Sequence, residues 1–424
     1  MIGQEMINLA KELYPINRSL SGEGVRETLK ILQRENTELN IYEIKSKTQV
    51  FDWVVPKEWN CFEAYIITPD GEKICDYSTN NLHIVQYSIP FEGDMELEEL
   101  DKQLYSYSKL PDAIPYVTSY YNEKWGFCIS ENERKKLKQG KYKVVIKSEV
   151  KDGVLNYADI VIPGESKKEI MFSTYICHPS MVNNELSGPV LATFLAKYIK
   201  SIDNYYTYRF VFAPETIGSL IYMSDKLEKL KQNVKAGFIL TCVGDERAYS
   251  YLSSRYGDTP ADKVALNLLE NEIKEFKRYS FLDRGSDERQ YCAPGIDLPF
   301  CSVMRSKYAV YPEYHTSLDN FDIVTAKGLE DSYSLYIKMI EVLENNFKYQ
   351  VKVLGEPQLG KRGLYPTSCT PDTDYSLAFL YRNFLAYADG NNDLVDIANI
   401  IGVSAYRLVE ITKLFMEHKL IFKG

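Results

Sequence analysis

Histidine is scarce in this chain of 424 residues, which contains only His83, His178, His315 and His418. Metal or acid–base chemistry must therefore come from these four imidazoles or from carboxylates. The eight cysteines form no CxxC pair, which favours reduced, buried thiols over a disulfide framework or a structural zinc knot. No apolar run approaches the roughly 20 residues that a membrane span needs, so no membrane partner is expected.

The chain also lacks a basic excess and a secretory leader. It has 59 acidic and 50 basic side chains, a formal net charge of −9, and this balance argues against nucleic acid as a partner. The first residues have no basic segment followed by an apolar stretch, so a cytoplasmic location is expected. The hydrophobic and charged fractions, 45% and 26%, are those of an ordinary globular protein.

The chain has three successive segments with different patterns of apolar residues. Residues 5–36 have helical apolar spacing, interrupted by a turn at 15–22. From about 50 to 160, short β-branched and aromatic runs such as 64–68, 84–87 and 142–146 alternate with turns, which indicates an antiparallel β module. Beyond it, continuous apolar strands alternate with helices, which predicts an α/β fold with a buried, mixed and largely parallel sheet. Helices are expected at 188–200, 219–231, 260–276 and 326–345.

The C-terminal part begins after a stretch rich in proline and glycine, 355–373. Three helices are predicted at 376–387, 393–401 and 404–418. Residues 393–398 and the turn at 402–404 are typical of the first helix and the turn of a helix-turn-helix. From Asp372 to Gly424 there are seven acidic and five basic residues. A DNA-reading helix should be basic, so contact with a protein partner or homo-oligomerisation is favoured over DNA binding.

The polar residues that carry chemistry follow the predicted parallel strands. In an open α/β sheet, ligands bind beyond the carboxyl ends of the strands. His178, Glu215 and Asp245 each follow one apolar strand, and Asp287 and His315 lie on loops that flank another. Imidazole and carboxylate are ligands that zinc accepts, with three protein ligands and one open position in catalytic sites. The sequence therefore predicts a metal site at this edge.

The order of these motifs resembles the zinc-dependent exopeptidases of the aminopeptidase type. The resemblance is carried by His178, by Asn184-Glu185-Leu186-Ser187-Gly188, by Pro214-Glu215-Thr216 and by Tyr314-His315-Thr316. It is closest to bacterial aminopeptidase-like proteins that end in a winged helix and are often named for polysaccharide biosynthesis. Arg18, in Ile16-Asn17-Arg18-Ser19-Leu20, is similar to the opening of that subfamily.

The resemblance implies an aminopeptidase-like, three-layer α/β fold with an inserted β-rich domain and a C-terminal winged helix. The implied domains are 1–49 with 160–352 for the α/β part, 50–159 for the insert, 353–371 for a linker and 372–424 for the winged helix. The implied activity is hydrolysis of a peptide or aminoacyl amide.

Departures from the family pattern reduce the expected number of metals. Ser180 stands where an aspartate usually orients the first histidine, Asn184 where an aspartate bridges two ions, and Thr241 where a further aspartate is expected. A carboxylate-bridged pair of ions needs those carboxylates. One zinc ion is therefore expected rather than two.

Roles follow from the resemblance. His178, Glu185 and His315 are expected to hold the zinc, and Glu215 to act as the catalytic base, although a ligand role for Glu215 stays open. Asn184, Asp245 and Asp287 are expected to contact substrate or to support the site.

Two alternatives also remain open. One is a single-zinc acyl transferase similar to glutaminyl cyclase, in which Glu185, Glu215 and His315 are the ligands. The other is a scaffold or regulator that has lost its activity and acts through the winged helix.

Overall fold

The computed structural model describes residues 2–367, 370–371 and 373–424. Contacts group them into two compact units. The first is Met1–Gly257 with Lys277–Tyr333, and the second is Asp258–Phe276 with Ser334–Gly424. None of the described helices is both long enough and apolar enough to span a bilayer. The predicted start of the winged helix, Asp372, lies outside the described residues, as do residues 368 and 369 of the predicted linker.

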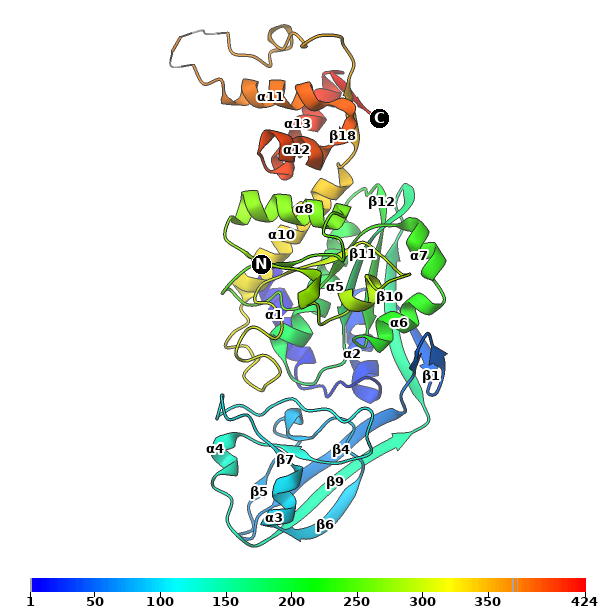
Figure 1. Ribbon diagram of the computed structural model, residues 1–424, viewed down its shortest axis with the longest axis vertical. Helices are drawn as coiled ribbons and strands as arrows, with labels where there is room; N and C mark the ends of the chain where they lie inside the picture. The colour runs from blue at the N-terminus through cyan, green and yellow to red at the C-terminus, as the bar shows by residue number, and fades with distance from the viewer. Residues whose placement is uncertain (1, 368–369, 372) are drawn as a thin grey trace. The chain divides into compact units, whose positions relative to one another are not determined.

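An eight-stranded mixed sheet forms the centre of the first unit (Figure 1). Its four middle strands are parallel, and antiparallel strands border them on both sides. Across the sheet the order is β1 (Asn40–Lys45), β10 (Val154–Ile162), β12 (Tyr206–Ala213), β11 (Ser166–Tyr175), β13 (Val234–Ile239), β16 (Phe300–Met304), β14 (Ser250–Leu252) and β15 (Lys277–Tyr279). The predicted boundary at residue 159 thus falls inside β10.

Helices cover the sheet because its strands are apolar on both faces. Along β11, Met171 and Tyr175 pack in one cluster with Leu220 and Ile221, whereas the intervening residues point to the opposite face. The helices of this unit include α1 (Ile2–Leu13), α2 (Glu23–Glu35), α5 (Ser187–Ile199), α6 (Ile217–Ser224), α7 (Leu227–Asn233) and α9 (Glu288–Tyr291). The single helix predicted over 219–231 is wrong: α6 ends at Ser224 and α7 begins at Leu227.

The β module contains a four-stranded antiparallel sheet in the order β5, β4, β9, β6. These strands are β4 (Glu58–Ile67), β5 (Lys73–Ile74), β6 (Phe91–Glu96) and β9 (Lys141–Lys151). The strand predicted at 84–87 is wrong, since this segment makes only isolated bridges at Ile84 and Gln86. Tyr87 has a φ of 65°, a left-handed conformation that cannot continue an extended strand.

The C-terminal part of the second unit combines three helices with a small sheet. The helices α11 (Ser376–Tyr387), α12 (Leu394–Ile401) and α13 (Ala405–Glu417) agree with the three that the sequence predicts. The antiparallel strands β17 (Lys348–Val351), β18 (Asp389–Asp393) and β19 (Ile421–Lys423) complete the unit. Asp393 caps α12 through a capping box, and Gly402 ends it with a φ of 71°.

The helix α8 (Pro260–Leu268) groups with this second unit. The helix predicted over 260–276 is shorter than expected, because a π-helical turn at Leu269–Ile273 follows α8. Asn267 explains the grouping: its amide nitrogen donates to the Val403 carbonyl, 3.1 Å, and its oxygen accepts from the Ala405 N–H, 2.6 Å.

A buried charge network ties three strands of the large sheet together. Arg209 on β12 binds Glu169 on β11 through two hydrogen bonds, 2.6 and 3.0 Å. Its remaining nitrogen lies 3.2 Å from the Asp159 carboxylate on β10, which also accepts from the Tyr222 hydroxyl, 2.6 Å. All three charged side chains are at most 4% exposed. Removing the guanidinium would leave two carboxylates buried without a countercharge.

We therefore expect Arg209→Leu to lower the free energy of unfolding by about 3–5 kcal/mol, the cost of breaking a buried ion pair. Urea unfolding followed by circular dichroism measures this change. The matched control is Arg34→Leu, because Arg34 pairs with Glu12 on the exposed surface, where the loss should stay below about 1 kcal/mol. Equal losses in the two variants would contradict the prediction.

Candidate functional site

Two neighbouring parallel strands bring His178 and Glu215 together. Tyr175, at the end of β11, pairs with Ala213, at the end of β12. His178 follows the first by three residues and Glu215 follows the second by two, so both emerge from the same edge of the sheet. The imidazole Nε2 of His178 lies 3.8 Å from Glu215 Oε2. The expectation that strand ends gather the polar residues agrees with this geometry.

The opposite ring nitrogen of His178 is bound to Glu185. The Nδ1 to Oε2 distance is 2.8 Å, and both side chains are buried. Glu185 therefore lies on the Nδ1 side of the ring, away from the direction in which Nε2 points. It supplies the carboxylate that orients the imidazole, which the sequence shows to be missing at Ser180. Of the predicted trio of His178, Glu185 and His315, the first two are thus in direct contact through Nδ1.

Glu185 reaches this position through an unusual turn. Residues Val182–Leu186 form a single π-helical turn before α5, a feature that is often found at functional sites. Its five residues are all buried. The Asp319 carboxylate accepts hydrogen bonds from the N–H groups of Val182, Asn183 and Asn184 at 3.2, 2.6 and 2.9 Å. One buried side chain thus fixes the entry of the turn.

Arg18 supplies a positive charge inside the site. Its side chain is fully buried, and Nε lies 3.3 Å from Glu185 Oε1. The same Nε donates to the His178 carbonyl, 3.0 Å, and Nη1 donates to the Leu13 carbonyl, 2.7 Å. Burial raises the pKa of Glu185 to about 8, while Arg18 acts to lower it. The guanidinium thus offsets only part of the cost of burying the charged form, and at neutral pH Glu185 is largely protonated.

Glu215 lies on a strained turn. Its Oε1 accepts a 2.6 Å hydrogen bond from the Ser286 hydroxyl, and its N–H donates to the Cys177 sulfur, 3.2 Å. The next residue, Thr216, has a φ of 67°, which is unfavourable for a β-branched residue. Burial raises the pKa of Glu215 to about 8, and the nearby Asp287 charge raises it further, whereas the Ser286 hydrogen bond lowers it. A buried carboxyl with a raised pKa is suited to proton transfer near neutral pH.

Asp287 holds this turn in place. Its Oδ1 accepts from the Thr216 N–H, 2.6 Å, and from the Ser219 hydroxyl, 3.1 Å. Its Oδ2 is buried without a hydrogen-bond partner. Burial raises the pKa of Asp287 to about 7, and the Thr216 N–H lowers it. One oxygen of Asp287 therefore supports the site, and the other is left for a ligand.

His315 lies beside His178, with ring centroids 5.3 Å apart. It has a φ of 56°, stacks on Tyr314 at 3.8 Å, and its Nε2 is buried without a hydrogen-bond partner. Burial lowers the pKa values of both imidazoles, that of His178 to about 3. Both rings are therefore neutral at physiological pH, the state in which imidazole binds metals.

The β module contributes Tyr116 to the site. This ring makes edge contacts with His178 and with His315, at centroid distances of 5.2 and 5.0 Å. The Tyr116 N–H donates to the His315 carbonyl, 2.8 Å, and the Ser317 N–H donates to the Ile114 carbonyl, 2.9 Å. The insert is therefore part of the site wall and fixes the loop that carries His315.

The other two predicted residues have internal partners. The Asn184 amide oxygen accepts from the Tyr175 hydroxyl, 2.9 Å, while its Nδ2 is buried and unpaired. The Asp245 carboxylate accepts from the Asn183 amide, 3.0 Å, from the Ser306 N–H and hydroxyl, both 2.9 Å, and from the Arg247 N–H, 2.9 Å. Both oxygens of Asp245 thus bind neighbouring loops.

The tightest group of possible metal ligands is Cys177, His178 and Glu185, whose ligand atoms all lie within 4.8 Å of one another. The contacts within this group argue against a metal there, because Glu185 and His178 Nδ1 already bind each other. Burial raises the pKa of the Cys177 thiol well above its usual value, so a thiolate ligand is disfavoured. His178 Nε2 and His315 Nε2 are the imidazole nitrogens that stay open to an ion.

The sequence prediction missed four residues that contribute to the site: Tyr116, Ser286, Asp319 and, as a contact of Glu185, Arg18. Ser286 precedes the predicted Asp287. The sequence distinguishes Arg18 only by its likeness to the N-terminal motif of a subfamily. No periodicity or spacing distinguishes Asp319 from an ordinary surface aspartate. Tyr116 comes from a different module, and only the folded chain brings it to the histidines.

A cavity of about 410 Å³ opens beside His315. Its walls come from the β module and from the loop before His315, and they include Tyr105, Tyr107, Pro115, Val117, Tyr311 and Tyr314. The lining thus includes four tyrosines, with an imidazole at one side.

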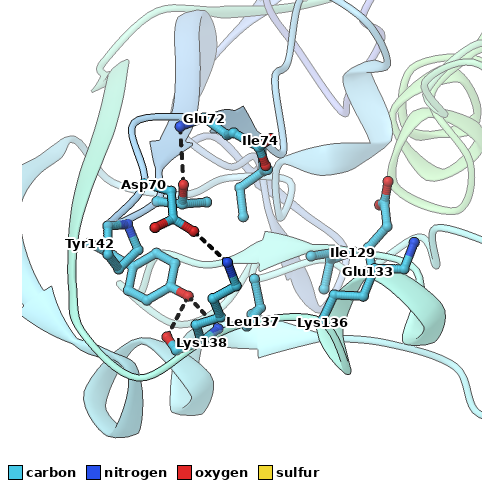
Figure 2. A pocket seen from close by; sticks show the side chains of 11 residues that line it. Asp70, Glu72, Ile74, Ile129, Glu133, Lys136, Leu137, Lys138 and Tyr142 are labelled. Atoms are coloured by element: carbon cyan, nitrogen blue, oxygen red, sulfur yellow. Dashed lines mark hydrogen bonds and ion pairs between the residues drawn. The ribbon is translucent and has the colours of Figure 1, made fainter.

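A separate cavity of about 360 Å³ is lined by β-module residues alone (Figure 2). There Lys138 forms a 2.7 Å ion pair with Asp70, and the Tyr142 hydroxyl donates to the Lys138 carbonyl, 2.8 Å. No histidine or cysteine is among its lining residues.

Comparisons with known proteins agree with this architecture. Residues 7–346 match the model of a domain of unknown function, DUF4910, and residues 347–423 match a winged helix-turn-helix. A protein of Clostridium acetobutylicum is 44% identical over 411 residues, which are 96% of this chain and 93% of that relative. Its name provisionally assigns it to polysaccharide biosynthesis and gives it an aminopeptidase-like domain.

Solved structures show the same fold. A crystal structure from Clostridium acetobutylicum, provisionally named a peptidase, has a TM-score of 0.92 and 42% identity, and covers 100% of this chain and 96% of that one. A zinc aminopeptidase from Bacillus subtilis has a TM-score of 0.57 and 13% identity, with 80% and 93% covered, which shows the fold alone. The predicted aminopeptidase-like α/β fold with a C-terminal winged helix is confirmed.

The Asp319 cluster yields a stability prediction. In Asp319→Asn an NH₂ group replaces one accepting oxygen, so at least one buried N–H of the π-helical turn loses its partner, at a cost of about 1–3 kcal/mol. Urea unfolding measures this loss. The control is Asp322→Asn, because Asp322 is exposed on the same loop. An unchanged stability of Asp319→Asn would contradict the role assigned to Asp319.

Proposed function

Since the chain belongs to the DUF4910 family and has a peptidase-like scaffold, we propose that it is a zinc-dependent hydrolase that cleaves a peptide or aminoacyl amide. The observation that carries the proposal is the arrangement around His178. One ring nitrogen is bound by Glu185 at 2.8 Å, and the other points toward Glu215 at 3.8 Å. An oriented, neutral imidazole beside a buried carboxyl is the pairing that metal-assisted hydrolysis requires.

The side chains present fit a zinc ion. Nε2 of His315 is buried without a hydrogen-bond partner, and Nε2 of His178 has no closer partner among the described residues than Glu215. An unpaired buried acceptor is costly unless a ligand satisfies it. His178 and His315 would therefore hold the ion. When bound, zinc polarises a carbonyl group and lowers the pKa of water.

One ion is proposed rather than two. The Arg18 guanidinium already places a positive charge 3.3 Å from Glu185 inside the site. Asn184 carries no charge with which to bridge a second cation, and its oxygen already accepts from the Tyr175 hydroxyl. A second dication would add repulsion in an interior that has little solvent to screen it.

Glu215 moves the proton in the proposed reaction. Ser286 binds Oε1 of Glu215 and so fixes the carboxyl group. Oε2 then lies on the side of His178 Nε2. Oε2 accepts a proton from the attacking water and passes it to the nitrogen of the leaving amine. Through Oδ1, Asp287 holds the Thr216 N–H and thus the backbone that presents Glu215, while its Oδ2 stays unpaired.

Metal content tests the histidines. We expect the protein purified with added zinc to bind about one ion per chain, and the double variant His178→Ala with His315→Ala to lose it, because both proposed nitrogen ligands are gone. Inductively coupled plasma mass spectrometry gives the zinc content. His418→Ala, in the last helical turn of the second unit, is the control and should bind as the wild type does. Unchanged zinc in the double variant would end the metal-site proposal.

Turnover tests Glu215. In Glu215→Gln we expect zinc to be retained and turnover to fall by about 10²–10⁴-fold, the usual contribution of a general base. The assay uses amino-acid anilides and, because of the likeness to a relative named for polysaccharide biosynthesis, aminoacyl sugars. Glu246→Gln is the control, since Glu246 is an exposed carboxylate on another strand-end loop.

The two readouts separate the alternatives. Loss of zinc in Glu215→Gln would make Glu215 a ligand, as in the single-zinc acyl-transferase alternative. Absence of turnover of any amide by zinc-loaded wild type would favour the scaffold alternative, in which the winged helix contacts a protein partner.

A further inference from the structure

A cavity of about 600 Å³ in the first unit is lined by three arginines and by no carboxylate among the described residues. Arg255 comes from the loop after β14, whereas Arg284 and Arg289 come from the loop and short helix that follow β15. The whole chain has a net charge of −9. Two separate segments thus bring three guanidinium groups to one cavity. The cavity lining is positive, whereas the chain as a whole is negative.

The positive charge is only partly neutralised. Arg255 forms an ion pair with Asp297 and donates to the Tyr256 hydroxyl, 2.9 Å, but its Nε is buried without a hydrogen-bond partner. Arg284 and Arg289 form no ion pair within the described part of the chain. Arg284 donates to the Phe281 carbonyl, 3.2 Å, and Arg289 donates to the Thr216 hydroxyl, 3.3 Å. The lining itself is therefore positive, which suits an anion, while Asp283, which binds Ser280 of the lining, and Asp287, whose charge interacts with that of Arg289, reduce the local excess.

Two of the guanidinium groups are held by aromatic rings. Arg255 lies over Tyr256, 4.7 Å from the ring centroid, and Arg284 lies over Phe281 at 4.8 Å. Such contacts fix a long side chain while its N–H groups stay available to an anion. Less side-chain entropy is then lost when an anion binds, because the arginines are already ordered.

The rest of the lining is apolar and exposed. Tyr256 is 74% exposed and Leu282 is 85% exposed, and both line the cavity together with Ala293 and Pro294. Large apolar side chains left in solvent beside fixed charges are typical of a ligand surface. This surface suits a flat or apolar body attached to the anionic group.

We propose that this cavity binds a phosphate monoester of an aromatic or otherwise apolar molecule. The guanidinium groups of Arg284, Arg289 and Arg255 would bind the phosphate oxygens, and Tyr256 and Leu282 would contact the body of the ligand. A phosphate is favoured over a carboxylate because it carries close to two negative charges and has three accepting oxygens, which several guanidinium groups can bind at the same time.

The site has a connection to Glu215 but is independent of the proposed metal. Arg289 donates to Thr216, the residue after Glu215, and none of the lining residues is a proposed zinc ligand or base. Binding can therefore be measured on metal-free protein, so failure of the hydrolase proposal and failure of this one are distinguishable.

The test is isothermal titration calorimetry of the full chain with phenyl phosphate, inorganic phosphate and phenol. We expect phenyl phosphate to bind more tightly than inorganic phosphate, and phenol to give no measurable binding. Affinity for phenyl phosphate should fall as sodium chloride is added, because charge attraction is screened. In Arg284→Gln with Arg289→Gln it should fall at least tenfold. Both arginines are exposed, so a stable fold is expected and is checked by the melting temperature.

Arg34→Gln is the matched control, since Arg34 is an exposed arginine paired with Glu12 on the N-terminal helices. It should bind phenyl phosphate as the wild type does. Unchanged affinity in the double variant would overturn the site. Equal affinity for phenol and phenyl phosphate, or for inorganic and phenyl phosphate, would overturn the assigned ligand chemistry. Should the double variant prove unstable, Arg284→Gln alone gives the same comparison.

Discussion

The buried contact between Arg18 and Glu185 is the interaction on which the site depends. Glu185 orients His178, and the Arg18 guanidinium offsets part of the cost of burying the charged form of Glu185. This guanidinium comes from the turn between α1 and α2, at the opposite end of the first unit's sequence from His315. The same guanidinium binds the backbone carbonyls of Leu13 and His178. The N-terminal helices are therefore part of the functional centre and not only a cover for the sheet.

The β module has a comparable role on the other side. Tyr116 touches both imidazoles, and backbone hydrogen bonds join its segment to His315 and Ser317. A loop that carries a functional residue is usually more mobile than the strands around it. Here the insert restrains that loop, and the same insert lines the cavity beside His315. The β module thus both restrains the loop that carries His315 and forms part of the cavity wall beside it.

Much of the fold could be predicted from the sequence, because buried parallel strands have long apolar runs and covering helices have a clear period. The order of the strand-end residues likewise predicted that His178 and Glu215 lie at one edge. The strand predicted over 84–87 is wrong. Its β-branched residues favour a strand, but the left-handed conformation of Tyr87 ends the extended chain. The contact of Glu185 with His178 Nδ1 could not be predicted, because the direction of Glu185 is set by the π-helical turn at Val182–Leu186, which has no periodicity in the sequence.

Backbone strain marks the two residues that the sheet edge must present most accurately. Thr216, next to Glu215, and His315 both have left-handed φ angles, 67° and 56°, although neither is glycine. Such conformations cost on the order of 1–3 kcal/mol each and persist only when the surroundings enforce them. Asp287 enforces the first through the Thr216 N–H, and the strand-like pairing with Tyr116 enforces the second. Buried hydrogen bonds are each worth roughly 0.5–1.5 kcal/mol. Several hydrogen bonds are therefore needed to hold Thr216 and several to hold His315, which explains why many polar groups surround few catalytic candidates.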